Sequence, residues 1–207
     1  MGRMGGALNN REKGGNQRNG YATPTYALDE LIPYLRAFHN NFFDNKGRVP
    51  VFWEPTVTDE GGSGIAHALR NCDFDVTATG LPETDFLACK EPLGDIVITN
   101  PPYGLGLREK FLRKLYGWGI PWAMLMPLTS LEGLGRGKLW QKYGCELLVY
   151  DDRIDFTPIP DPIPTDRQLV EEAKQPLRKM SVPWFNASWF CHGLLPEKLM
   201  FAHLVRR

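Results

Sequence analysis

One short run of residue types could hold an amine in place for chemistry: Asn100, Pro101, Pro102 and Tyr103. The run follows residues 95–99, whose mostly β-branched apolar side chains predict a buried strand of a parallel sheet. The two prolines cannot donate hydrogen bonds to a sheet and favour an extended backbone at Asn100, so the strand should end there. Because ligands of open α/β sheets bind beyond the carboxyl ends of the strands, we expect these four residues to lie at a binding site.

The chemistry that suits these residues is methyl transfer to a planar amino group. The Asn100 side-chain oxygen and the Pro101 carbonyl oxygen can both accept hydrogen bonds, so together they can hold the two N–H groups of such an amine. The Tyr103 ring offers a flat face on which the planar group can stack. Two fixed acceptors also concentrate electron density on the amine nitrogen and aim it. The alternative interpretation is structural, with a proline turn after a core strand.

Asn100-Pro101-Pro102-Tyr103 resembles the catalytic motif of amino-methyltransferases that use S-adenosylmethionine, particularly the adenine-N6 DNA methyltransferases. The resemblance implies catalytic roles for these four residues and a cofactor contact for Asn100. A second segment, Tyr-x-Thr-Pro, resembles the N-terminal cofactor motif of the same enzymes, which approaches the methionine end of the cofactor. The residues of that segment are Tyr21, Thr23 and Pro24. Both motifs in one chain are more informative than either alone.

A glycine-rich segment follows the first expected strand. It resembles the Glu-Pro plus glycine-rich cofactor loop of these enzymes, which implies that Glu54, Pro55, Gly62 and Gly64 contact the cofactor. Glycines let a backbone pass close to a ligand, and the helix N-terminus beyond them offers N–H donors. The loop departs from the family pattern, because the interval from Glu54 to Ile65 is about three residues longer and the glycine register is ambiguous.

A third segment, Asp85-Phe86, resembles the Asp-Phe segment of the family. The resemblance implies that the acid accepts a hydrogen bond from the amino group of the cofactor's adenine and that the apolar side chain flanks the base. A second departure lies just before it. Gly80 stands at the end of the second expected strand, where the family carries an acidic residue for the ribose hydroxyls, and Glu83 nearby is a possible substitute.

Four alternations of strand and helix predict an α/β fold with a parallel sheet. Strands are expected at residues 51–55, 74–79, 95–99, 122–127, 147–150 and 185–191, and helices around residues 28–35, 65–70, 111–116 and 131–143. The first helix also offers a structural interpretation of the N-terminal motif, in which Thr23 or Thr25 caps it. The resemblance implies a single-domain, Rossmann-like class I methyltransferase with a mostly parallel sheet, helices on both faces and a C-terminal antiparallel hairpin.

The C-terminal part resembles the phage-type adenine methyltransferases in two segments. Arg153–Phe156 and Ser188–Phe190 match the Arg-Ile-Asp-Phe and Ser-Trp-Phe sequences that lie in the last two strands of those enzymes. Between them we expect an irregular proline-rich loop at about residues 157–183, because alternate prolines remove hydrogen-bond donors. Three basic residues of that loop are candidates for contact with DNA phosphates, against the alternative of an ordinary solvated loop: Lys174, Arg178 and Lys179.

The totals suit one globular domain over residues 21–207 after a basic, Gly- and Asn-rich tail at residues 1–20, which we expect to be flexible. The chain has 207 residues, 43% of them hydrophobic, and a formal net charge of zero, which argues against binding nucleic acid through bulk charge. The four cysteines are widely spaced, so no metal site is expected. We expect no membrane span and a cytoplasmic location. Oligomeric state stays open, although a monomer is compatible with one domain.

These observations predict an S-adenosylmethionine-dependent methyltransferase that acts on the N6 amine of a flipped-out adenine in DNA. Two alternatives stay open at this point. One is an enzyme with the same motif that acts on RNA or on the glutamine amide of a protein, because any planar amide or amine suits the same acceptors. The other is a protein that retains the fold and nucleic-acid binding but has lost catalysis, which the longer glycine loop and Gly80 would explain.

Overall fold

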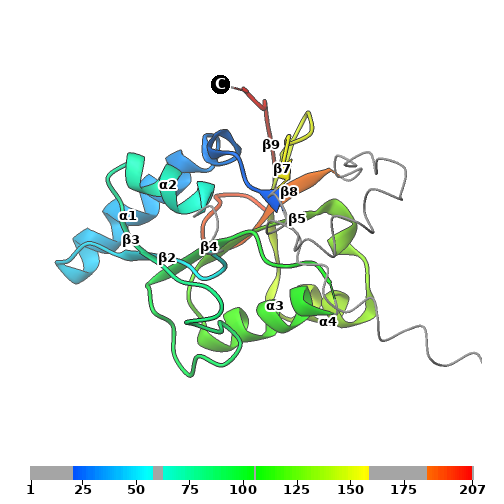
Figure 1. Ribbon diagram of the computed structural model, residues 1–207, viewed down its shortest axis with the longest axis horizontal. Helices are drawn as coiled ribbons and strands as arrows, with labels where there is room; N and C mark the ends of the chain where they lie inside the picture. Colours follow the sequence, from blue (N-terminus) through cyan, green and yellow to red (C-terminus); the bar gives the residue numbers. More distant parts are fainter. Residues whose placement is uncertain (1–20, 58–62, 105, 159–185, 207) are drawn as a thin grey trace, which may run out of the picture.

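The computed structural model describes residues 21–57, 63–104, 106–158 and 186–206. Its centre is a seven-stranded sheet with the strand order β3-β2-β4-β5-β8-β6-β9 (Figure 1). The strands are β2 (Val51–Glu54), β3 (Asp75–Ala78), β4 (Ile96–Thr99), β5 (Trp122–Pro127), β6 (Glu146–Tyr150), β8 (Ala187–His192) and β9 (Leu199–Ala202). The predicted α/β class is therefore confirmed, and the strand order is consistent with a Rossmann-like methyltransferase topology.

Most neighbouring strands of this sheet are parallel. β3, β2, β4 and β5 pair in parallel, as do β6 and β9, whereas β8 is antiparallel to both of its neighbours, β5 and β6. The expected antiparallel pairing of the C-terminal segment is confirmed, but the expected hairpin differs in detail. β8 is inserted between β5 and β6, and Arg153–Phe156 forms no strand. After it, β7 (Thr157–Pro158) pairs with β1 (Tyr21–Ala22) in a separate two-stranded sheet.

Helices cover both faces of the sheet, as predicted. Figure 1 shows α1 (Ile32–Lys46) and α2 (Gly64–Asn71) on one side and α3 (Leu107–Trp118) and α4 (Leu134–Tyr143) on the other. Successive side chains of a strand point to opposite faces, so each strand contributes to both hydrophobic cores. The α1–α2 side contains Phe52, Ile96, Ile98, Leu125 and Trp189, and the α3–α4 side contains Trp53, Val97, Met124 and Phe190. Burial on both faces explains the continuous apolar runs of β4 and β5.

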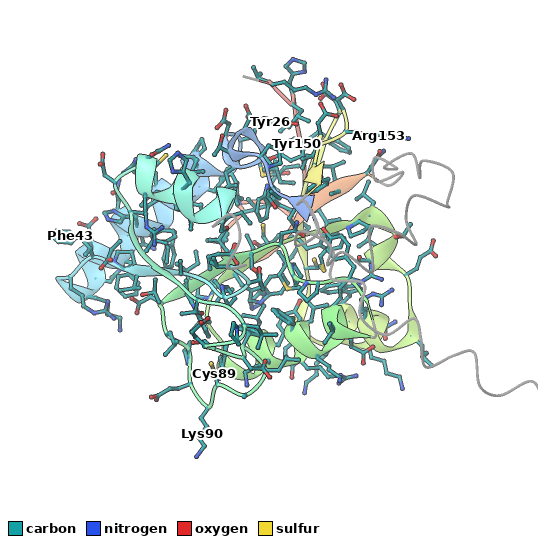
Figure 2. All side chains as sticks on the ribbon, in the orientation of Figure 1. Tyr26, Phe43, Cys89, Lys90, Tyr150 and Arg153 are labelled. Atoms are coloured by element: carbon teal, nitrogen blue, oxygen red, sulfur yellow. The ribbon has the colours of Figure 1, made fainter. Side chains whose placement is uncertain are left out.

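The N-terminal segment is held against the sheet by two side chains from its far half. Tyr150 of β6 donates a hydrogen bond to the Ala27 carbonyl oxygen at 2.8 Å, and Trp189 of β8 donates to the same oxygen at 2.7 Å. Figure 2 labels Tyr26 and Tyr150 on these neighbouring segments. The Tyr26 hydroxyl also accepts a hydrogen bond from the Asp155 backbone N–H at 2.8 Å. These bonds hold the short helix η1 (Thr25–Leu28), and the chain just before it, at the carboxyl edge of the sheet.

The structural alternative for the N-terminal motif, in which Thr23 or Thr25 caps the first helix, is not observed. Pro24 precedes η1 and Leu31 precedes α1, and neither helix has a side-chain cap. Thr23 instead bonds to a residue far along the chain, as described below. The helix expected at residues 131–143 begins as a separate turn, η2 (Leu128–Leu131), followed by α4. Within the part of the chain that the structure describes, no helix has the length and apolarity needed to cross a membrane.

Candidate active site

The Asn-Pro-Pro-Tyr segment lies at the carboxyl end of β4, where the sequence predicted it. All four residues of β4 are buried, and Asn100 is the first residue beyond the strand. β4 lies between β2 and β5 and is parallel to both, so the carboxyl ends of these three strands meet at one edge of the sheet. The Glu-Pro segment after β2 and the residues after β5 are therefore neighbours of Asn100.

The Asn100 side chain joins two of the sequence motifs. Its Nδ2 donates a hydrogen bond to Thr23 Oγ1 at 3.0 Å, and its Oδ1 accepts one from the Tyr103 hydroxyl at 2.6 Å. Thr23 is 7% exposed, so its hydroxyl is a fixed partner rather than a solvated one. These two bonds set the orientation of the amide, with its nitrogen toward Thr23 and its oxygen toward Tyr103. A carbonyl oxygen has a second lone pair, so Oδ1 can accept one further hydrogen bond.

Tyr103 packs against the α3–α4 core with its hydroxyl turned inward. Besides its bond to Asn100, the hydroxyl lies 3.1 Å from the Leu125 carbonyl oxygen. Burial raises the pKa of Tyr103 far above its ordinary value, so the phenol is neutral at physiological pH. The Arg108 guanidinium carbon lies 5.7 Å from the centre of the ring. A neutral aromatic ring next to an amide oxygen suits the binding of a planar, uncharged base.

Glu54 is the most buried acid of this edge, with 1% of its surface exposed. Its Oε1 accepts from the Thr56 backbone N–H at 2.9 Å, the Thr56 hydroxyl at 2.8 Å and the Thr99 hydroxyl at 2.9 Å. Its Oε2 accepts from the Ser63 hydroxyl at 3.3 Å. Burial raises the pKa of Glu54 to about 7, although these hydrogen bonds favour the charged form. The carboxyl group therefore connects the end of β2, the glycine loop and the end of β4.

The hydroxyl residues of this network were not predicted from the sequence. The Thr56 hydroxyl, which donates to Glu54, lies 2.8 Å from the Thr99 hydroxyl and 3.3 Å from the Asn100 carbonyl oxygen. Ser63 also caps α2, where its hydroxyl accepts from the Ala66 N–H. In the sequence, Thr56 lies two residues after Glu54 and Thr99 directly precedes Asn100. Only the parallel pairing of β2 with β4 shows that Thr56 and Thr99 meet.

Of the two glycines expected at the cofactor, the structure describes only Gly64, because Gly62 lies outside the described residues. Gly64 begins α2, and a Cβ atom there would lie 1.9 Å from the Thr23 carbonyl oxygen. Its small size therefore allows the first turn of α2 to pack against the N-terminal segment. This packing holds Thr23 next to Asn100, whatever else the glycine loop contacts.

Gly80 has no space for any side chain. A Cβ atom would lie 1.8 Å from the Val57 carbonyl oxygen, because residues after β2 cross over the end of β3, with the Val57 N–H bonded to the Thr79 carbonyl oxygen at 2.9 Å. An acidic residue at Gly80 would require the backbone to move. The packing of the segment after β2 against the end of β3 thus requires glycine at position 80.

Gly80→Ala is expected to lower the free energy of unfolding by roughly 1–3 kcal/mol, because the new methyl group overlaps backbone atoms. Gly137→Ala in α4 is the matched control. Nothing lies within 4 Å of its Cβ position, and an alanine in a helix should stabilise the fold by roughly 0.5–1 kcal/mol. Urea unfolding of the two variants measures the contrast. Equal stability of Gly80→Ala and the parent chain would contradict the close packing at Val57.

Asp85 and Phe86 point in different directions. Asp85 is exposed, and its Oδ1 accepts from the Leu87 N–H at 2.8 Å. Phe86 is 3% exposed and stacks on Phe111 of α3, with ring centres 4.2 Å apart. Phe86 thereby anchors the segment between β3 and β4 in the α3–α4 core, whereas the Asp85 carboxylate stays accessible. The basic candidates Lys174, Arg178 and Lys179 lie outside the described residues.

A different hollow, of about 760 Å³, lies at the opposite end of the sheet. It is lined by residues at the amino ends of β2, β4 and β5 and by α1, among them Val51, Asp95, Pro121, Phe38 and Phe42. Its charged groups include an ion pair, Arg48 with Asp95 at 2.7 Å. None of the predicted site residues lines this hollow, so it has no part in the candidate site.

The described residues contain no group of three or more His, Cys, Asp or Glu side chains that could hold a metal ion. The four cysteines are free thiols, and Cys191 is buried in the core as expected, whereas Cys72, Cys89 and Cys145 are half-buried. Burial raises the pKa of Cys145 to about 12, so this thiol is not a nucleophile at neutral pH.

Comparison with known proteins gives no match to a protein-family model, to a curated protein or to a solved structure.

Proposed function

We propose that this protein is an S-adenosylmethionine-dependent methyltransferase that transfers a methyl group to the N6 amine of adenine in DNA. One observation carries the proposal: the Asn100 amide is held between Thr23 and Tyr103 at the carboxyl end of β4. The arrangement brings two segments with the family resemblance, 77 residues apart in sequence, into direct contact. A strand order consistent with a Rossmann-like methyltransferase supports it further.

We expect side chains at this edge to contact the two ends of the cofactor. Thr23 and Asn100 would offer polar groups to the methionine end of the cofactor. The adenine end would lie at Asp85. Within the described structure only Oδ1 of the Asp85 carboxylate accepts a hydrogen bond, from the Leu87 N–H, so Oδ2 can accept one from the adenine amino group. The ribose has no acid at Gly80, and the exposed Glu83 is the nearest substitute. When bound, the cofactor supplies an electrophilic methyl group. The residues of the chain orient the amine that receives it.

Substrate binding would use the free acceptor capacity of the Asn-Pro-Pro-Tyr segment. Asn100 Oδ1 and the Pro101 carbonyl oxygen would accept the two N–H groups of the flipped adenine, and the Tyr103 ring would stack on the base. Extruding the base costs a few kcal/mol in stacking and pairing. The two acceptors raise the electron density on N6, and the amine can release its proton to solvent after transfer, so no dedicated base is needed.

Tyr103→Ala is expected to lower kcat/KM for DNA roughly 10- to 100-fold, because stacking of a base on an aromatic ring contributes about 1–3 kcal/mol. Tyr103→Phe is the matched variant. It keeps the ring and loses only the hydroxyl bonds to Asn100 and Leu125, so it should keep most of the activity and lose about 1 kcal/mol of stability. Steady-state kinetics and urea unfolding separate the two effects. Equal losses of kcat/KM in both variants would contradict a stacking role.

The strongest alternative is a protein with this fold that has lost catalysis. Gly80 favours it, because the position that would hold the ribose is filled by the loop after β2. Transfer to RNA or to a protein amide is the other alternative, since Asn100 and Pro101 would accept those N–H groups equally well.

The test is methyl transfer from labelled S-adenosylmethionine to DNA, RNA and protein substrates, followed by nucleoside and amino-acid analysis. Label recovered as N6-methyladenine in DNA is the expected result. Label in RNA or in glutamine would reassign the substrate. No label, together with no rise in melting temperature on adding the cofactor, would overturn the proposal in favour of the catalytically inactive protein, because a ligand that binds the native state stabilises it.

A further inference from the structure

Two arginines converge on one serine next to Tyr103. Arg108 lies in the first turn of α3, and its Nη1 donates to Ser130 Oγ at 2.8 Å. Arg136 lies in the first turn of α4, and its Nε donates to the Ser130 carbonyl oxygen at 2.8 Å. Arg136 also bonds to the Glu132 carbonyl oxygen. Ser130 is fully buried in η2, so both guanidinium groups are attached to a rigid point just beyond β5.

Neither guanidinium has an acidic partner within the part of the chain that the structure describes. The arginines found there in ion pairs are Arg48, Arg113 and Arg206. Partial burial and the nearby charge of Arg136 lower the pKa of Arg108 from its ordinary value. Within the described residues no carboxylate forms an ion pair with either guanidinium, although the Glu109 carboxylate lies against Gly135 of the same helix turn as Arg136. The two like charges repel each other, and a bound anion would relieve that repulsion.

The position of Arg108 near the Tyr103 ring favours a nucleotide phosphate as the anion that the two arginines bind. The Arg108 guanidinium carbon lies 5.7 Å from the centre of the Tyr103 ring, and in a nucleotide the phosphate is one sugar away from the base. We propose that Arg108 and Arg136 bind a backbone phosphate of DNA next to the adenine that stacks on Tyr103. This inference rests on the proposed function of Tyr103 as the platform for the target base.

The chemistry of the pair favours a nucleic acid over a protein amide as the substrate. Arginine presents a planar fork of N–H groups that matches two phosphate oxygens, and each of these two guanidinium groups keeps further N–H donors beyond its bonds to Ser130. A glutamine side chain carries no charge and would leave the pair uncompensated. Phosphate contacts also fix the register of a protein on DNA, which would place one nucleotide over Tyr103.

The salt dependence of DNA binding tests the site. Binding of a fluorescein-labelled 20-base-pair duplex is measured by anisotropy between 50 and 200 mM NaCl without cofactor, about the range over which phosphate contacts are diagnostic. Losing one phosphate contact should reduce the slope of log K against log salt by about 0.9. We expect that reduction for Arg108→Gln and for Arg108→Gln combined with Arg136→Gln. Arg108→Lys, which keeps the charge, should retain the parent slope.

Arg113→Gln is the matched control. Arg113 lies on the same helix but pairs with Glu109 at 2.6 Å, so its loss should leave the slope unchanged. Melting temperatures show whether each variant is folded. If the double variant is unstable, the slope of Arg108→Gln alone decides the test. A parent chain that does not bind the duplex, or an unchanged slope in Arg108→Gln, overturns the inference.

The inference and the proposed function fail separately. Because binding is measured without the cofactor, the slope does not depend on catalysis. A protein that methylates DNA with an unchanged slope in Arg108→Gln keeps the proposed function and loses the phosphate site. A protein that shows the slope change but transfers no methyl group keeps the phosphate site and loses the proposed activity.

Discussion

Asn100→Ala is expected to lower the rate of methyl transfer by about 10²- to 10³-fold, the usual effect of removing one fixed hydrogen-bonding group from a reacting centre. The Asn100 oxygen is held at 2.6 Å from the Tyr103 hydroxyl and would accept an N–H group of the substrate through its second lone pair. The affinity for S-adenosylmethionine should fall much less than the rate, because Thr23 and other residues of the edge would still contact the cofactor. Single-turnover transfer to DNA and calorimetric binding of the cofactor measure the two quantities.

The control for this variant is Asn71→Ala, at the exposed end of α2. It should transfer methyl groups at the parent rate. Asn100→Ala also loses the bond from Nδ2 to Thr23, so its melting temperature is compared with that of Thr23→Val, which loses the same bond but keeps the acceptor oxygen. Near-normal turnover by Asn100→Ala would contradict its placement at the reacting centre.

Glu54→Gln is expected to stabilise the protein above pH 7 and to leave its stability unchanged near pH 4.5. The pKa of Glu54 rises from 4.5 to about 7 on folding, so between these values the native state binds a proton that the unfolded chain lacks. The free energy of unfolding therefore falls as pH rises through this window, by about 3 kcal/mol in total, and then levels off. Glutamine does not titrate, so the variant lacks this loss.

The neutral amide also suits the site. Its oxygen can accept from Thr56 and Thr99 as Oε1 does, and its nitrogen can donate to Ser63, whose hydroxyl lies 3.3 Å from Oε2. Urea unfolding at pH 5 and pH 8 measures the difference between variant and parent, in which the contribution of His203, whose pKa is raised by Asp151, cancels. Glu197→Gln, at an exposed position, should follow the parent at both pH values. A constant difference at the two pH values would contradict the titration of Glu54.

If Asn100→Ala and Glu54→Gln behave as expected, they show that Asn100 and Glu54 have different roles at the carboxyl edge of the sheet. Asn100 would act on the substrate amine, whereas Glu54 would hold the glycine loop to β4 through Thr56 and Thr99. Burial of the charge raises the pKa of Glu54 to about 7, and below that pH the protonated carboxyl group can still accept hydrogen bonds from Thr56 and Thr99. The Thr56 hydroxyl also lies 3.3 Å from the Asn100 carbonyl oxygen, so the segment just after β2 is attached to the end of β4.

The sequence by itself determined the α/β class and the position of the candidate centre. Continuous apolar runs such as residues 122–127 are stable only when both faces of a strand are covered, so they indicate a parallel sheet between two helix layers. Two prolines after β4 cannot continue a strand, which places Asn100 at the edge of the sheet. These are local effects of side-chain type and backbone geometry, and a single sequence contains them.

Only the tertiary structure decided which side chains meet. Thr23 suits a helix cap by local pattern, yet it bonds to Asn100 because Ala27 is held by Tyr150 and Trp189 from the other half of the sheet. Gly80 cannot be replaced by a larger residue without backbone movement, because the Val57 carbonyl oxygen occupies the space of a Cβ atom. The insertion of β8 between β5 and β6 likewise depends on pairing between distant segments. Such contacts follow from long-range packing, which local residue patterns do not encode.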